Sequence, residues 1–217
     1  MSSKKKSGWW ERKSDKYKDT KEEKKLKMHD DKNSKTSKKK AASIEAKVVL
    51  LGDSGVGKTA ISTKYTSGYF PDTTAPTLGG SYNKKEVTLK NGERITLHIW
   101  DTAGSESSRA MLPLYYRDAA AGLITYDIGN ERSFEHVEYW SNELSQKLKP
   151  GSFTIALVGN KNDIPEDEKK ITTVYAYKYA KEHDYLFAEI SAKTGDGVSE
   201  IFSELAEKIY AIKVKSE

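Results

Sequence analysis

The sequence predicts an α/β fold in which about five helices flank a six-stranded, mostly parallel sheet with one antiparallel edge strand. From Ala46 onward, short apolar runs alternate with amphipathic stretches, the pattern of helices layered on a parallel sheet. The dipeptide Asn91-Gly92 separates two strand-like runs and favours a tight hairpin, which makes that pair antiparallel. A glycine-rich loop, residues 52–59, joins the apolar run KVVLL to a helical stretch.

The elements follow in a regular order along the chain. Strands are expected at residues 47–51, 85–89, 94–100, 122–126, 154–158 and 185–190. Helices are expected at residues 58–66, 134–148, 172–182 and 198–211. In the last of these, apolar side chains recur at helical spacing at Ile201, Leu205, Ile209 and Ile212.

Charge divides the 217 residues into an appendage and one domain. Residues 1–43 hold sixteen Lys and Arg against seven Asp and Glu, a net charge of +9. The rest of the chain holds 21 basic and 25 acidic residues, a net charge of −4. We therefore expect a Lys-rich extension at residues 1–43, a folded domain at residues 44–213 and a short tail at residues 214–217.

The extension has too few apolar residues to offset the entropy of ordering, so we expect it to be disordered unless a partner organises it. A solvated tail is the simplest interpretation of its charge. The alternatives are attraction to an acidic protein surface or to an anionic membrane, and we do not expect nucleic acid as the partner. Trp9 and Trp10 are better explained by docking into a pocket than by solvation.

The sequence contains no Cys, which excludes disulfides, a cysteine nucleophile and a lipid anchor on a cysteine. No apolar run approaches the ~20 residues of a membrane-spanning helix. We expect a soluble, intracellular, cytoplasmic protein, found in the cytosol, at an endomembrane surface or in a cytoskeletal assembly.

The segment GDSGVGKT, residues 52–59, has the strand-loop-helix context of a phosphate-binding loop, which predicts a P-loop NTPase. Its glycines let backbone N–H groups approach phosphates closely, and the following helix points its positive end at the anion. Lys58 adds a point charge at the β- and γ-phosphates. The expected contacts here are Asp53, Ser54, Gly55, Val56, Gly57, Lys58, Thr59 and Ala60.

A magnesium site is expected beside this loop. The Thr59 hydroxyl can bind Mg²⁺ directly, and Asp101, at the end of a strand, can reach the ion through water. Gly104 then offers a backbone N–H to the γ-phosphate with no Cβ in the way.

Two further segments follow apolar strands at the same sheet edge and predict a base pocket. They are GNKND, residues 159–163, and EISAK, residues 189–193, which supplies Ser191, Ala192 and Lys193. The Asp163 carboxylate can accept two parallel hydrogen bonds from guanine, which adenine cannot supply.

With these motifs, residues 46–211 resemble the small GTPases of the Ras superfamily, most closely the Rab branch. LHIWDTAG, YYRDA and ITYDI are similar to Rab segments, and GDSGVGKT is the usual Rab form of the phosphate loop. The resemblance implies GTP or GDP with Mg²⁺ as cofactors and a switch in vesicle trafficking. It also implies that Thr77 binds Mg²⁺ and that Phe70 packs against guanine. Asn160 would brace the base pocket, Lys161 would lie along the base, and the Ala192 N–H would contact the guanine carbonyl.

Ser105 stands where the family has Gln. Since phosphoryl transfer needs positioning of water and stabilisation of charge, a missing water-orienting group lowers the rate more than the affinity. The expected catalytic set is therefore Ser105, Lys58, Thr77 and Gly104, with slow hydrolysis of GTP. The alternative is that Glu106 or a partner positions the water.

Other departures concern partners. Ser107 and Ser108 replace a basic residue and an aromatic, so we expect Tyr82 and Trp100 to lack the third member of the aromatic cluster that Rab partners contact. The chain ends at Glu217 without a cysteine, so we expect no prenyl-dependent membrane cycle.

Two functions fit these observations. The first is a Rab-like GTPase switch that binds an effector through its switch regions. The second is a structural or adaptor protein that holds guanine nucleotide as a folding ligand and joins a larger assembly through its basic extension.

Overall fold

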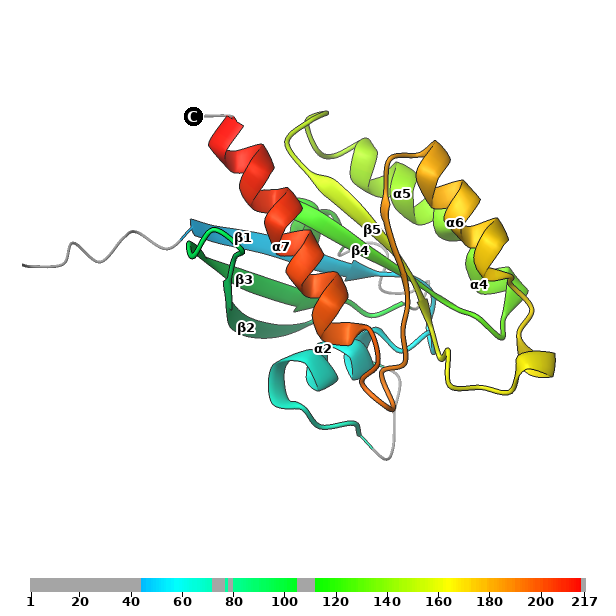
Figure 1. Cartoon of the computed structure of the whole chain (residues 1–217). Helices are drawn as coiled ribbons and strands as arrows, with labels where there is room; N and C mark the ends of the chain where they lie inside the picture. Colours follow the sequence, from blue (N-terminus) through cyan, green and yellow to red (C-terminus); the bar gives the residue numbers. More distant parts are fainter. Residues whose placement is uncertain (1–43, 72–76, 78–79, 105–111, 216–217) are drawn as a thin grey trace, which may run out of the picture. The chain divides into compact units, whose positions relative to one another are not determined.

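The computed structural model describes residues 44–71, 77, 80–104 and 112–215. The six strands form one sheet in the order β2-β3-β1-β4-β5-β6 (Figure 1). They are β1 Ile44–Leu51, β2 Ser81–Thr88, β3 Arg94–Asp101, β4 Ala119–Asp127, β5 Thr154–Asn160 and β6 Leu186–Glu189. The helices are α2 Lys58–Ser67, α3 Leu112–Tyr116, α4 Glu131–Glu135, α5 Val137–Ser145, α6 Thr173–Glu182 and α7 Val198–Lys215, with a 3-10 turn, η2, at Glu166–Glu168.

The sheet has the predicted strand directions. β1 pairs in parallel with β3 and β4, and β5 pairs in parallel with β4 and β6. β2 is the edge strand and runs antiparallel to β3. Their connection turns at Gly92, whose φ is +85°, a conformation that glycine adopts without strain. The predicted fold class and the hairpin at Asn91-Gly92 are thus confirmed.

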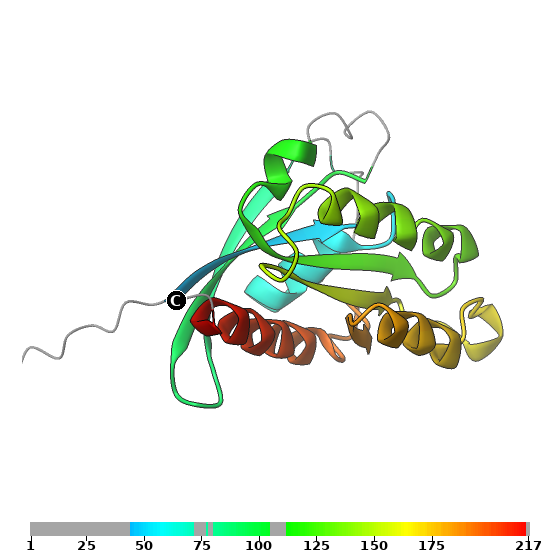
Figure 2. The same cartoon turned by 90° about the horizontal axis from the view of Figure 1, so that it is seen from above.

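Helices cover both faces of the sheet, as Figure 2 shows for α5 and α7 on opposite sides. Alternation along β1 explains why: Val48 and Leu50 join a core with α2 and α7, while Val49 and Leu51 join a second core with α4, α5 and α6. Because β1 is buried on both faces, it reads as the continuous apolar run KVVLL.

Some element bounds differ from the sequence prediction. The helix expected at residues 134–148 is divided at His136 into α4 and α5. The prediction contained neither α3 nor η2, which span five and three residues and are too short to show a helical period. The last helix continues to Lys215.

The carboxyl ends of the parallel strands bring the predicted motifs to one edge of the sheet. Residues 52–57 follow β1, residues 102–104 follow β3, and residues 161–165 follow β5. Loops at this edge are where ligands bind in open α/β sheets. Among the residues that the structure describes, no helix combines the length and the apolar character needed to cross a lipid bilayer.

Candidate functional site

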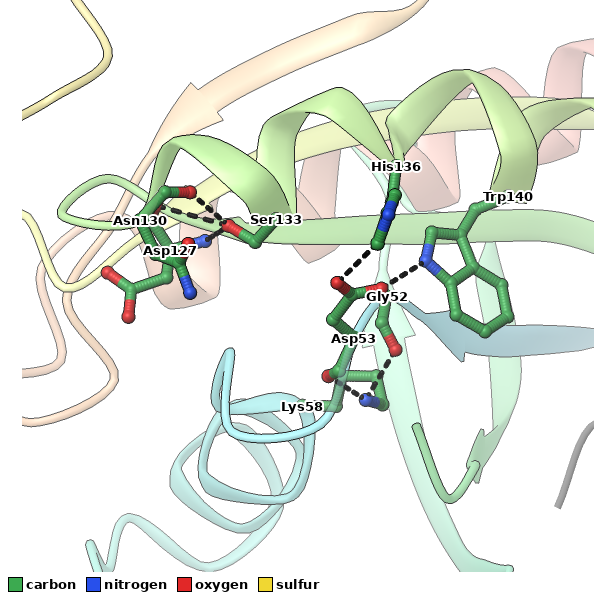
Figure 3. A network of polar contacts seen from close by, with 8 residues as sticks. All are labelled: Gly52, Asp53, Lys58, Asp127, Asn130, Ser133, His136 and Trp140. Atoms are coloured by element: carbon green, nitrogen blue, oxygen red, sulfur yellow. Dashed lines mark hydrogen bonds and ion pairs between the residues drawn. The ribbon is translucent and has the colours of Figure 1, made fainter. Parts of the chain in front are cut away.

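The phosphate loop curls around the Lys58 side chain. The ammonium group donates hydrogen bonds to the carbonyl oxygens of Gly52 and Asp53, each at 2.7 Å (Figure 3). Lys58 is 5% exposed, and burial lowers the pKa of its ammonium group to about 8, although the nearby Asp101 and Asp53 carboxylates oppose the shift. A bound phosphate would supply the negative charge that this desolvated cation lacks.

Gly57 and Gly104 allow the close approaches on which the loop depends. Gly57 has a φ of +99°, and a Cβ there would collide with the Nδ2 atom of Asn160. A Cβ on Gly104 would lie 2.5 Å from both the Asp53 carbonyl carbon and the Lys58 Nζ atom. The backbone of Gly104 therefore lies close to Asp53 and to the Lys58 ammonium group.

A cluster of oxygen atoms lies beside Lys58. The Thr59 hydroxyl lies 2.8 Å from the Thr77 hydroxyl and donates to Asp101 Oδ2 at 2.7 Å. Asp101 is fully buried, and within the described part of the chain no hydrogen bond reaches its Oδ1 atom. Burial raises the pKa of this carboxyl group, and the Thr59 hydrogen bond opposes the shift.

This cluster fits Mg²⁺. With Mg–O bonds of 2.0–2.1 Å, adjacent ligands of an octahedral ion stand about 2.9 Å apart, close to the separation of the two threonine hydroxyls. The unpartnered Asp101 oxygen is an acceptor for a water on such an ion. Within the described residues, no group of three or more His, Cys, Asp or Glu could hold a metal, so an ion here needs phosphate oxygens as further ligands.

Asn160 joins the phosphate loop to the base pocket. Its amide donates to the Val56 carbonyl at 2.8 Å and accepts from the Ala192 N–H at 3.0 Å, and the residue is 2% exposed. These two hydrogen bonds fix the Asn160 side chain between the phosphate loop and the segment that follows β6. The Ala192 N–H already has Asn160 as its acceptor, so a guanine carbonyl would share that donor.

Asp163 is held by two partners. The Ser191 hydroxyl donates to its Oδ1 atom at 2.5 Å, and Lys193 lies 3.7 Å from its Oδ2 atom. Lys161 adopts a φ of +71° and pairs with Asp127 at 2.5 Å, which fixes the side chain across the end of β4. A carboxylate and an aliphatic lysine chain thus border the expected base position.

Most of the predicted residues line one cavity of about 380 Å³. They are Ser54, Gly55, Gly57, Lys58, Thr59, Ala60, Phe70, Thr77, Gly104, Asn160, Lys161, Asp163, Ala192 and Lys193. Asp53, Val56 and Ser191 do not line it. The Asp53 side chain turns toward α5, while Val56 and Ser191 are buried and support Asn160 and Asp163.

Three lining residues were absent from the sequence prediction: Thr63, Pro71 and Ile164. Thr63 lies one helical turn beyond Thr59 on α2, so helical periodicity could have identified it. Pro71 and Ile164 directly follow Phe70 and Asp163, and no residue pattern distinguishes them from ordinary loop positions.

The expected loss of the third aromatic is wrong. The ring centroid of Trp100 lies 5.3 Å from that of Tyr82 and 5.9 Å from that of Tyr115. Because Tyr115 comes from α3, it completes a three-ring cluster that depends on neither Ser107 nor Ser108. Those two serines and the expected catalytic Ser105 lie outside the described residues, as do Trp9 and Trp10.

A sequence model of the Ras family matches residues 47–211 of this chain. The chain belongs to the Ras family. It is 40% identical over 174 residues to "Ras-related protein Rab-5B" of Plasmodium falciparum, covering 80% of this chain and 82% of that protein. It is 36% identical over 176 residues to "GTP-binding protein ypt5" of Schizosaccharomyces pombe, covering 81% and 83%.

A third relative, "Ras-related protein Rab-5A" of Dictyostelium discoideum, is 40% identical over 163 residues, 75% of this chain and 80% of that protein. These likenesses confirm the predicted Rab branch. The protein is therefore a Rab-like small GTPase with a basic extension before the matched region.

Proposed function

We propose that this Rab-like small GTPase is a molecular switch that binds GTP and GDP together with Mg²⁺. The observation that carries the proposal is a single cavity with three chemically distinct parts: the buried Lys58 ammonium, the paired Thr59 and Thr77 hydroxyls, and the Asp163 carboxylate. The cation would pair with phosphate oxygens, the two hydroxyls would bind the ion beside the phosphates, and the carboxylate would accept hydrogen bonds from the base. Bound Mg²⁺ would neutralise charge on the phosphate oxygens.

The chain's own residues have distinct parts in this proposal. Lys58 pairs with phosphate oxygens, while Thr59, Thr77 and, through water, Asp101 hold the ion. Gly104 donates its N–H to the terminal phosphate. These groups are already oriented by the phosphate loop and by the Thr59–Asp101 hydrogen bond, so binding requires little rearrangement.

Base recognition provides the test. Asp163→Asn keeps one acceptor oxygen and replaces the other with an NH2 donor that faces a guanine N–H, so one charge-assisted hydrogen bond is lost and the other loses its charge. At about 1.5–3 kcal/mol for the lost bond, the affinity for GDP should fall by about 10- to 100-fold. Binding of a fluorescent GDP to the purified protein measures this change.

The matched control is Asp167→Asn, which makes the same change of charge at an exposed residue of η2 outside the cavity. It should bind GDP like the unmodified protein. Retained GDP affinity in Asp163→Asn would contradict the assignment of the base pocket.

The effector is proposed to contact the switch segments around Thr77 and Gly104, with the three-ring cluster at their side. The basic extension would add contact with an acidic protein surface or an anionic membrane within the cytoplasm. The complete cluster favours the switch over a passive adaptor. A switch partner should bind GDP-loaded and GTP-analogue-loaded protein with different affinity, whereas an adaptor partner should bind both equally.

A further inference from the structure

We infer that His136 and Trp140 are positioning residues for the phosphate loop, which they hold through the side chain of Asp53. The inference rests on the proposed function, because it concerns how firmly the loop retains a bound nucleotide. Its starting point is that the Asp53 side chain turns away from the cavity although the residue belongs to the loop.

Both carboxylate oxygens of Asp53 are engaged by one helical segment (Figure 3). His136 Nδ1 lies 2.6 Å from Oδ2, and Trp140 Nε1 donates to Oδ1 at 3.1 Å. An ionised carboxylate only accepts hydrogen bonds, so Nδ1 of His136 must carry a proton in this contact. The side chains of His136 and Asp53 are 34% and 22% exposed, so the pair is partly shielded from water.

The two donors sit on a firmly anchored segment. Trp140 is 1% exposed and is packed in the core between α5 and the sheet. The start of α4 is tied to the end of β4 by Ser133, whose hydroxyl donates to the Asn130 carbonyl at 2.6 Å and accepts from the Asp127 N–H at 3.0 Å. His136 lies where α4 meets α5, so its position is fixed relative to the sheet.

The backbone of the same Asp53 faces the phosphate site. Its carbonyl accepts one of the two hydrogen bonds that orient the Lys58 ammonium. Its carbonyl oxygen also lies 2.6 Å from the point where a Cβ of Gly104 would stand. The position of the Asp53 peptide group thus determines both the orientation of the Lys58 ammonium group and how closely Gly104 can approach the loop. A loop released from His136 and Trp140 should hold the phosphates less firmly.

The test measures release of a fluorescent GDP from the full chain, with Mg²⁺ and excess unlabelled GDP. His136→Ala should accelerate release about tenfold, the low end of what a hydrogen bond to a charged group contributes. Trp140→Phe keeps most of the buried volume and removes the Nε1–H, and should accelerate release similarly. His136→Asn retains an N–H near the Nδ1 position and should stay within about threefold of the unmodified protein.

His183→Ala is the matched control, since His183 contacts the Tyr179 carbonyl at the end of α6. It should leave release unchanged. The decisive comparison uses Asp53→Ala: in that background, adding His136→Ala should have no further effect. If His136 only stabilised the α4–α5 junction, His136→Ala would accelerate release in the Asp53→Ala background as well.

Equal release rates in all variants, or a full additional effect of His136→Ala on Asp53→Ala, would overturn the inference. If His136→Ala fails to fold, Trp140→Phe takes its place: it should accelerate release alone and have no further effect on Asp53→Ala. His136→Asn should again stay close to the unmodified protein. Failure of the unmodified protein to bind GDP would overturn the proposed function and this inference with it. Normal binding with unchanged release would overturn the inference alone.

Discussion

At the scale of single residues, Lys58 is a buried cation whose charged form is disfavoured by desolvation. Burial lowers the pKa of its ammonium group to about 8, so part of the Lys58 side chains become neutral near that pH before nucleotide binds. Phosphate stabilises the charged form and raises the pKa. Binding should therefore take up a proton, and affinity should fall as the pH rises through 8 toward the pKa of the bound state.

Calorimetry of GDP binding in two buffers with different ionisation enthalpies measures this uptake. At pH 8 we expect uptake of a fraction of a proton per nucleotide, and at pH 7 a smaller uptake by Lys58, because most of its ammonium groups are then charged in both states. An observed binding enthalpy that is independent of the buffer at pH 8 would contradict the role given to Lys58.

A second residue-level prediction is that Ser105 limits the rate of GTP hydrolysis. A serine hydroxyl is shorter than a glutamine amide, so we expect slow hydrolysis in the unmodified protein and at least tenfold faster single-turnover hydrolysis in Ser105→Gln. GDP affinity should be the same in both. Equal slow rates would show that Ser105 is not the limiting feature and would favour Glu106 or a partner as the group that positions water.

At the scale of elements, Gly122 sets the distance between β4 and α5. A Cβ at this position would collide with the Leu144 side chain. Gly122→Ala should therefore lower the free energy of unfolding by about 1–3 kcal/mol through overpacking. Leu144→Ala alone should cost about 2–5 kcal/mol by leaving a cavity.

The two changes should compensate in part, because the new methyl group enters the space that the leucine vacates. Denaturant unfolding of both single variants and the double variant measures the coupling. A double variant whose loss equals the sum of the single losses would show that the two side chains do not meet as described.

Most elements could be predicted from the sequence because their signals are local. Within only a few residues, the run KVVLL predicts a strand, Asn91-Gly92 predicts a turn, and the glycine-rich loop predicts a phosphate-binding loop. The break at His136 could not be predicted, because the helical pattern continues across it. The Asp53 contacts were also hidden, since they join residues more than 80 positions apart.

Motif spacing likewise predicted most of the residues that line the cavity, whereas the third aromatic ring could be placed only from the fold. Tyr115 was visible in YYRDA, but only the placement of α3 brings it against Trp100. Ser107 and Ser108 indicated that a ring was missing from the cluster, because that prediction used only neighbours in the sequence.

At the scale of the whole molecule, three segments of the chain bring the Lys58 ammonium, the Thr59 and Thr77 hydroxyls and the Asp163 carboxylate into one cavity. The ring cluster of Tyr82, Trp100 and Tyr115 does not line that cavity. Both the switch and the adaptor interpretation require that the cavity hold guanine nucleotide.

The most direct test is to identify the nucleotide carried by freshly purified protein. The protein is denatured after removal of free nucleotide, and the released compounds are separated and quantified by chromatography. We predict GDP or GTP at close to one molecule per chain, with Asp163→Asn carrying much less. Protein that is folded yet carries adenine nucleotide, or that carries none and fails to take up added GDP with Mg²⁺, would contradict the central claim.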